Sequence, residues 1–202
     1  MGKLPKTESC VAFVNANTIV YPLGHMICEQ TATSTEQKFL FRVPNECTAI
    51  AVSPDRRVVS FAIKSSDPDR SATLVVLQRD NLKQRMRTSF LAPGRVLAIQ
   101  FSSDSKSFVA IGGKSKHYAI GIYRWDMQRT IATTTLKDRI RRVQFVHGGG
   151  GGIIVAGENL LRSFHVSGMV LQEKLLLPAM KESSMDYTDI VRKYAGPTSD
   201  IC

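Results

Sequence analysis

The sequence predicts an all-β fold, because short apolar runs alternate with turn residues along most of the chain and this layout repeats. Val52, Phe101 and Phe145 hold equivalent places in the repeat, 49 and 44 residues apart. Such spacing is close to the ~40–45 residues of a four-stranded propeller blade, so we expect WD40-type β-propeller blades. The best-matched units cover residues 48–63, 96–111 and 141–156.

Each unit contains an apolar β-branched run, a polar turn and a second apolar run. The turns carry residues that favour chain reversal: Ser53-Pro54-Asp55, Ser103-Asp104 and Gly148 to Gly152. Further runs supply a third and a fourth strand to each unit: 72–78 and 84–90, 118–125 and 129–136, 160–166 and 169–175. The pair Trp125-Asp126, at the end of a third strand, takes the WD dipeptide position.

A weaker unit precedes these three, with strands expected at 10–14, 18–22, 25–29 and 37–43. The sequence therefore predicts about four blades within 10–177, a lead at 1–9 and a tail at 178–202 that is loose or forms a short helix. Four blades lie at the bottom of the usual range of about four to eight. We expect an incomplete ring, from a fragment or a chain that another chain completes, with closure as a four-blade ring as the alternative.

The 202 residues carry a net charge of +10, which favours acidic partners. Four cysteines lie too far apart in sequence for a zinc or disulfide framework, which predicts free thiols in a reducing compartment: Cys10, Cys28, Cys47 and Cys202. The sequence has neither an apolar run of membrane-spanning length nor a signal-like start. We therefore expect an intracellular protein that does not cross a membrane.

Stretches in the same order as in a known family carry a resemblance: Val20-Tyr-Pro-Leu-Gly-His25, Glu36-Gln-Lys-Phe39, Thr48 to Arg57, Phe101 to Lys106 with Gly112-Gly113, and Tyr123-Arg-Trp-Asp126. Over residues 10–166 the chain resembles the N-terminal propeller of the WD-repeat cilia- and flagella-associated proteins. Echinoderm-type microtubule-associated proteins share some of these signals. The family resemblance implies a scaffold on axonemal doublet microtubules that links inner dynein arm bases with the nexin–dynein regulatory complex. The 202 residues show no second propeller and no heptad repeat, so we carry over no family function that resides in the coiled coil.

No segment predicts catalysis or a cofactor. The run Phe108 to Ser115 ends like a phosphate loop, but Phe108 stands where that motif needs glycine, and a strand follows where it needs a helix. We expect the glycines from Gly148 to Gly152 to form a loop between two strands. The four histidines show no metal-ligand spacing, and there is no nucleophile elbow or carboxylate pair. The sequence predicts neither an enzyme nor a metal site.

Basic residues are the candidate protein-binding contacts: Arg56, Arg57, Lys83, Arg85, Arg87, Lys137, Arg139, Arg141 and Arg142. One interpretation is a solvated outer surface, and the other is a docking patch for an acidic surface such as tubulin. Lys83, Arg85 and Arg87 alternate along a predicted outer strand, so we expect them to share one face. Nucleic acid is disfavoured, because these basic stretches lack interleaved aromatic residues.

These observations predict a structural protein-interaction scaffold of the ciliary or flagellar axoneme, docked on or near the doublet microtubule. Its location would be the cytoplasm and cytoskeleton. The alternative is a general cytoplasmic WD-repeat adaptor that nucleates a multiprotein complex elsewhere, in trafficking, ubiquitin ligation or RNA processing.

Overall fold

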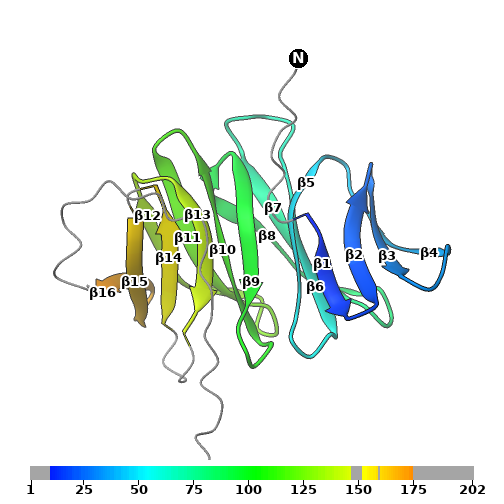
Figure 1. Ribbon diagram of the computed structural model, residues 1–202. Coiled ribbons are helices and arrows are strands. Elements are labelled where there is room, and N and C mark those ends of the chain that lie inside the picture. The colour runs from blue at the N-terminus through cyan, green and yellow to red at the C-terminus, as the bar shows by residue number, and fades with distance from the viewer. Residues whose placement is uncertain (1–9, 147–151, 159, 175–202) are drawn as a thin grey trace, which may run out of the picture.

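The computed structural model describes residues 10–146, 152–158 and 160–174 (Figure 1). These residues form sixteen strands in four antiparallel four-stranded units, named here blades 1 to 4. Blade 1 contains β1 (Ala12–Asn15), β2 (Thr18–Leu23), β3 (Met26–Thr31) and β4 (Gln37–Arg42). Blade 2 contains β5 (Cys47–Val52), β6 (Val58–Ile63), β7 (Ser71–Gln78) and β8 (Gln84–Pro93).

Blade 3 contains β9 (Arg95–Phe101), β10 (Ser107–Lys114), β11 (His117–Arg124) and β12 (Arg129–Leu136). Blade 4 contains β13 (Ile140–Phe145), β14 (Ile153–Gly157), β15 (Leu160–Ser167) and β16 (Val170–Lys174). The predicted all-β fold with a four-stranded repeat is confirmed. The possible helix within the tail lies outside the described residues.

The blades pack side by side through apolar clusters. In β6 every residue is buried, because blades 1 and 3 cover its two faces. Val59 and Phe61 belong to the cluster shared with blade 1, whereas Val58 and Ala62 belong to the cluster shared with blade 3. This division follows from the alternation of side chains along a strand. A third cluster joins blade 3 to blade 4.

The four blades fan out in the order of the chain from blade 1 to blade 4 (Figure 1). Among the described residues, the three apolar clusters join successive blades only, and none joins blade 4 back to blade 1. The described part of the chain is therefore an open arc, as the expected incomplete ring requires. Within it, no helix has the length and apolar character to cross a bilayer.

One link at the rim of the arc was not predicted. Outer strands β12 and β16 pair in parallel at a single position, Thr133 opposite Val170. The backbone N–H of Thr133 donates to the Met169 carbonyl at 3.1 Å. Blades 3 and 4 are thus joined both through their facing side chains and along their outer edges.

The turns after β5 and β9 have the same internal hydrogen bonds, which confirms the repeat in atomic detail. The Ser53 hydroxyl donates to the Asp55 carboxylate at 2.5 Å, and the Ser102 hydroxyl donates to Asp104 at 2.6 Å. In each turn the serine Oγ also accepts the backbone N–H five residues further on, at 3.1 Å. The hydrogen bond from Ser102 is the main cause that lowers the pKa of the Asp104 carboxyl.

Trp125 and Asp126, the two residues at the WD position, both have structural roles. Trp125 follows directly after β11, packs against the cluster between blades 2 and 3, and donates its indole N–H to the Ser105 carbonyl at 2.6 Å. Asp126 pairs with Arg124 at 3.1 Å. Trp125 therefore ties the β11–β12 turn to the β9–β10 turn.

The variant Trp125→Phe removes this indole donor but keeps an aromatic ring against the core. We expect the free energy of unfolding to fall by about 1 kcal/mol, the usual net contribution of one hydrogen bond. Urea unfolding followed by far-UV circular dichroism measures it, since Trp125 is the one tryptophan available for fluorescence. Met127→Ala in the same turn is the control, because Met127 is 51% exposed. An unchanged stability in Trp125→Phe would show that the hydrogen bond contributes nothing.

Candidate binding groove and basic residues

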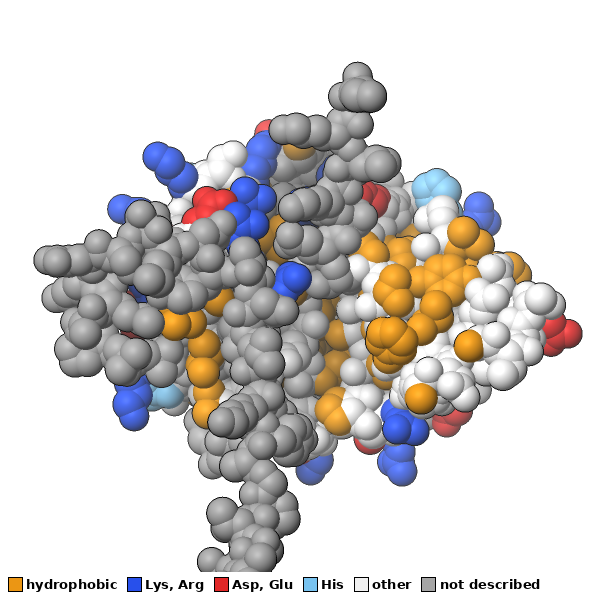
Figure 2. Space-filling model, viewed as in Figure 1, with side chains coloured by type: hydrophobic (Ala, Val, Ile, Leu, Met, Phe, Trp, Pro, Cys, Tyr) orange, Lys and Arg blue, Asp and Glu red, His pale blue; other side chains and the backbone are white. Residues whose placement is uncertain are grey.

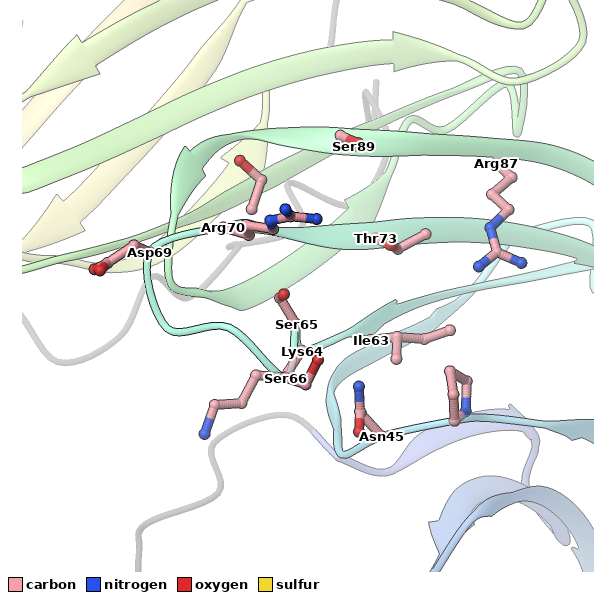
Figure 3. Close-up of a pocket in the computed structure, with 12 residues that line it drawn as sticks. Asn45, Ile63, Lys64, Ser65, Ser66, Asp69, Arg70, Thr73, Arg87 and Ser89 are labelled. Atoms are coloured by element: carbon pink, nitrogen blue, oxygen red, sulfur yellow. The ribbon is translucent and has the colours of Figure 1, made fainter.

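A polar groove of about 520 Å³ opens at the outer part of blade 2 (Figure 3). The β4–β5 link, the end of β6, the β6–β7 loop and strands β7 and β8 supply its lining: Pro44, Asn45, Ile63, Lys64, Ser65, Ser66, Asp69, Arg70, Ser71, Thr73, Arg87 and Ser89. Most of these side chains carry a hydroxyl, an amide or a charge.

The groove exists because neighbouring blades differ in strand length. Thr73 pairs with both Ile63 and Ser89, and Arg87 pairs with Val75, so all of them share one face of blade 2. Ile63 and Val75 belong to the cluster that packs against blade 1, so this is the face that blade 1 covers. Outer strands β7 and β8 have 8 and 10 residues, whereas β3 and β4 have 6 each. The shorter strands of blade 1 leave part of the face open.

Most charges of the lining have a partner. Lys64 lies 3.7 Å from Glu46, Arg70 lies 3.4 Å from Asp67, and Asp69 lies 3.4 Å from Lys114. Arg87 differs, because its side chain makes no ion pair or hydrogen bond with any described residue. Figure 3 shows Arg87 projecting from β8 on the same side of the sheet as Thr73 and Ile63.

Two hydroxyls beside Arg87 also have no partner within the described ranges, those of Thr73 and Ser89, and the hydroxyls of Ser66 and Ser71 lie further along the groove in the same state. A guanidinium offers a planar fork of N–H donors that fits a carboxylate or phosphate, and neighbouring hydroxyls can donate to the same oxygens. The three cationic side chains outnumber the one carboxylate in the lining. The chemistry of the groove thus suits an anionic group.

The predicted basic residues do not gather in one patch. Arg56 and Arg57 lie in the β5–β6 turn, and Lys83 lies in the β7–β8 turn. Lys137 and Arg139 lie in the β12–β13 link, with Arg141 and Arg142 in β13. In antiparallel blades these two sets of connections lie at opposite ends of the strands. The structure therefore divides the candidates into two groups.

The group beside β13 is partly neutralised. Arg139 and Arg141 both reach the Glu158 carboxylate, at 3.1 and 3.0 Å. Arg142 donates to the Arg141 carbonyl at 3.3 Å. Arg139, Arg141 and Arg142 therefore lie close together. Each already interacts with an oxygen of the same chain, which leaves less of their charge for a partner protein.

The expectation that Lys83, Arg85 and Arg87 share a face is not met. Lys83 precedes β8, and the pairing of β7 with β8 shifts register beside Arg85, which interrupts strict alternation. Arg87 alone of the three lines the groove. Sequence reasoning missed Lys64 and Arg70, for which the polar run from Ser65 to Ser71 was the available signal.

The described cysteines are free thiols. Cys10 and Cys47 lie in or beside the interface of blades 1 and 2, whereas Cys28 lies on the face of blade 1 that points away from blade 2. Burial is the main cause that raises the pKa of the Cys47 thiol to about 12. Burial likewise raises the pKa of Cys10 and of Cys28. These thiols stay protonated near neutral pH, so they are poor nucleophiles. Among the described residues, no three His, Cys, Asp or Glu side chains gather as a metal site would require.

No protein-family model and no curated protein matches the sequence. Among solved structures, the chain is similar to hydrazine synthase of Kuenenia stuttgartiensis, with a TM-score of 0.60, 14% identity and coverage of 77% of this chain and 49% of that one. It is also similar to the β-propeller domain of the Trilobed protease from Pyrococcus furiosus, which has an open velcro topology. There the TM-score is 0.56 at 11% identity, with 83% of this chain and 56% of that one covered.

The chain spans about half the length of each of these two structures. At such low identity the likeness shows the fold and nothing of activity. The four antiparallel blades and the two structural matches together establish the fold as that of a β-propeller.

Proposed function

We propose that this β-propeller arc is a structural protein-interaction scaffold that binds acidic segments of partner proteins and carries no catalytic site. The observation that carries the proposal is the groove on blade 2, where Arg87 and the neighbouring hydroxyls of Thr73 and Ser89 have no partners among the described residues. An extended acidic segment would place a carboxylate against the guanidinium and satisfy the hydroxyls beside it. Blade 2, which supplies most of the lining, is packed on both faces, so it holds the groove in place.

The proposed setting is the ciliary or flagellar axoneme, with the chain docked on or near the doublet microtubule. Support comes from the family resemblance over residues 10–166, where the chain resembles the N-terminal propeller of cilia- and flagella-associated protein fifty-seven. The net charge of +10 agrees with it, because tubulin is strongly acidic. The proposed partners are tubulin, the inner dynein arm base, the nexin–dynein regulatory complex and a further chain that completes the propeller. The second candidate remains a general cytoplasmic adaptor, which has the same fold and charge.

A binding measurement tests the groove itself. We expect a fluorescein-labelled glutamate-rich peptide to bind the purified chain, with an affinity that falls as salt rises. Arg87→Glu should weaken binding about tenfold, equivalent to about 1.4 kcal/mol. Fluorescence anisotropy at low and at physiological salt gives both values.

Arg129→Glu is the matched control, because Arg129 is exposed on β12, makes no ion pair with a described residue and lies outside the groove. Equal losses in the two variants would mean that overall charge, rather than the groove, holds the peptide. The groove would then be rejected as the binding site.

Cell fractionation tests the axonemal setting. We expect tagged protein to stay with demembranated, washed axonemes and to leave them only at high salt. Full recovery in the soluble cytoplasm would reject the axonemal proposal and favour the general adaptor. A groove that binds the acidic peptide would be compatible with either outcome.

A further inference from the structure

Blade 1 carries a contiguous apolar face that no described residue covers. Four large side chains stand out of it: Val11, Phe13, Leu23 and Phe39, which are 54%, 71%, 49% and 55% exposed. Figure 2 shows the resulting apolar patch over blade 1. Soluble proteins expose single apolar side chains freely, but a contiguous patch of large ones marks a contact surface.

Strand register places these side chains on a single face. Phe13 pairs with Ile19, Leu23 pairs with Met26, and Cys28 pairs with both Tyr21 and Phe39. Paired residues share a face, and so do residues two apart on one strand. The opposite face carries Val14, Val20 and Ile27, which pack against blade 2. The uncovered face of blade 1 is therefore largely apolar, and two of its polar members, Gln30 and Gln37, are hydrogen-bonded to Tyr21 on the same face.

The repeat indicates what belongs on this face. The corresponding face of blade 2 presents Val59 and Phe61 to blade 1, and both are fully buried. The corresponding face of blade 3 presents Phe108 and Tyr123 to blade 2, and that of blade 4 presents Phe164 to blade 3. In all three places the cover is the other face of the preceding blade. A blade face of the same apolar character is therefore the matching partner for blade 1.

Blade 4 of this chain does not match. Its outward face, which points away from blade 3, carries Gln144 and Ser163 on either side of Ile154. The same face carries His165, which pairs with Gln172. The inward face, with Val155 and Phe164, is the apolar one. Packing the outward face on blade 1, within one chain or between two copies, would bury these polar groups against Phe13 and its neighbours.

We infer that the free face of blade 1 binds a further propeller blade, distinct from blades 1 to 4, which presents an apolar sheet face. The inference rests on the proposed scaffold function and names the surface on which a completing blade would dock. It does not depend on the axonemal setting. The blade 2 groove and the blade 1 face are separate, so one chain could hold an acidic segment and a blade together.

The experiment places the photoreactive amino acid p-benzoylphenylalanine at Phe13 of the full chain in the cells that make it. After irradiation, mass spectrometry identifies the cross-linked peptide. We expect a peptide from a strand of a β-propeller blade that is not one of blades 1 to 4. The same amino acid at Met127, which is 51% exposed in the β11–β12 turn, should not give that product. A cross-link to a second copy, to a protein without a propeller, or to nothing overturns the inference.

Sedimentation velocity on the purified chain provides an independent check. We expect a monomer at micromolar concentration, with binding of the dye 1-anilinonaphthalene-8-sulfonate reduced at least threefold in the double variant Phe13→Ser, Phe39→Ser. A dimer that this variant dissociates would assign the face to a second copy and would contradict the inference. A propeller cross-link without axonemal retention would keep the inference and reject only the axonemal setting.

Discussion

Gly112→Ala is expected to lower the free energy of unfolding by about 3 kcal/mol or more, because the added methyl group meets backbone that cannot step aside. A Cβ on Gly112 would lie 2.7 Å from the Val96 Cα and in hard contact with the Arg95 carbonyl. Both atoms belong to β9, to which β10 pairs with a register shift at Gly112. The chain needs glycine here for close approach of two strands, and not for phosphate binding.

Gly24→Ala is the matched control. Gly24 has a φ of +55° but no heavy atom within 4 Å of an added Cβ. The substitution therefore adds left-handed strain without a clash, which costs about 1 kcal/mol. Urea unfolding of both variants separates the two effects. Equal losses would show that the strands of blade 3 can move apart to accept a methyl group.

Phe61→Ala is expected to cost about 3–5 kcal/mol, the range for removing a fully buried aromatic side chain. The Phe61 ring is 0% exposed and lies 5.3 Å from the Phe41 ring, centroid to centroid, across the boundary of blades 1 and 2. Its loss should loosen blade 1 in particular. Limited proteolysis should then cut the β4–β5 link around Pro44 and Asn45 faster than in the parent chain.

Phe39→Ala makes the same chemical change on the uncovered face of blade 1. Because Phe39 is 55% exposed, we expect a loss of less than about 1 kcal/mol. A large loss in Phe39→Ala would mean that the free face already packs within the isolated chain. That result would also weaken the case for a docking partner there.

The fold could be predicted because its signals are local. Apolar β-branched runs, the Ser-x-Asp turns and a repeat of 44 to 49 residues all lie within short stretches of sequence. Ser53 and Ser102 illustrate this, since each organises its own turn through contacts no more than five residues away. Such patterns fix strand positions to within a few residues.

The site could not be predicted in the same way, because it depends on contacts between distant segments. Arg87 lines a groove only because the outer strands of blade 1 are shorter than those of blade 2. Arg139 and Arg141 form ion pairs with Glu158, which directly follows β14 and is 17 or more residues away in the sequence. The bulge beside Arg85 breaks an alternation that the residue types alone suggest. None of these three features can be recognised from the residues next to it in the sequence.

The link between the outer strands of blades 3 and 4 has a mechanical consequence. Blades 1 and 2 meet at the rim only through side chains within the described residues, such as Arg79 with Glu29 at 2.7 Å. Blades 3 and 4 also share a main-chain hydrogen bond, from the Thr133 N–H to the Met169 carbonyl. Blades 3 and 4 are connected both at their packed faces and at the rim, so they resist twisting against each other. The boundary between blades 1 and 2 is held by side chains and can act as a hinge. Under load, blades 3 and 4 would turn together as a rigid lever while blade 1 swings.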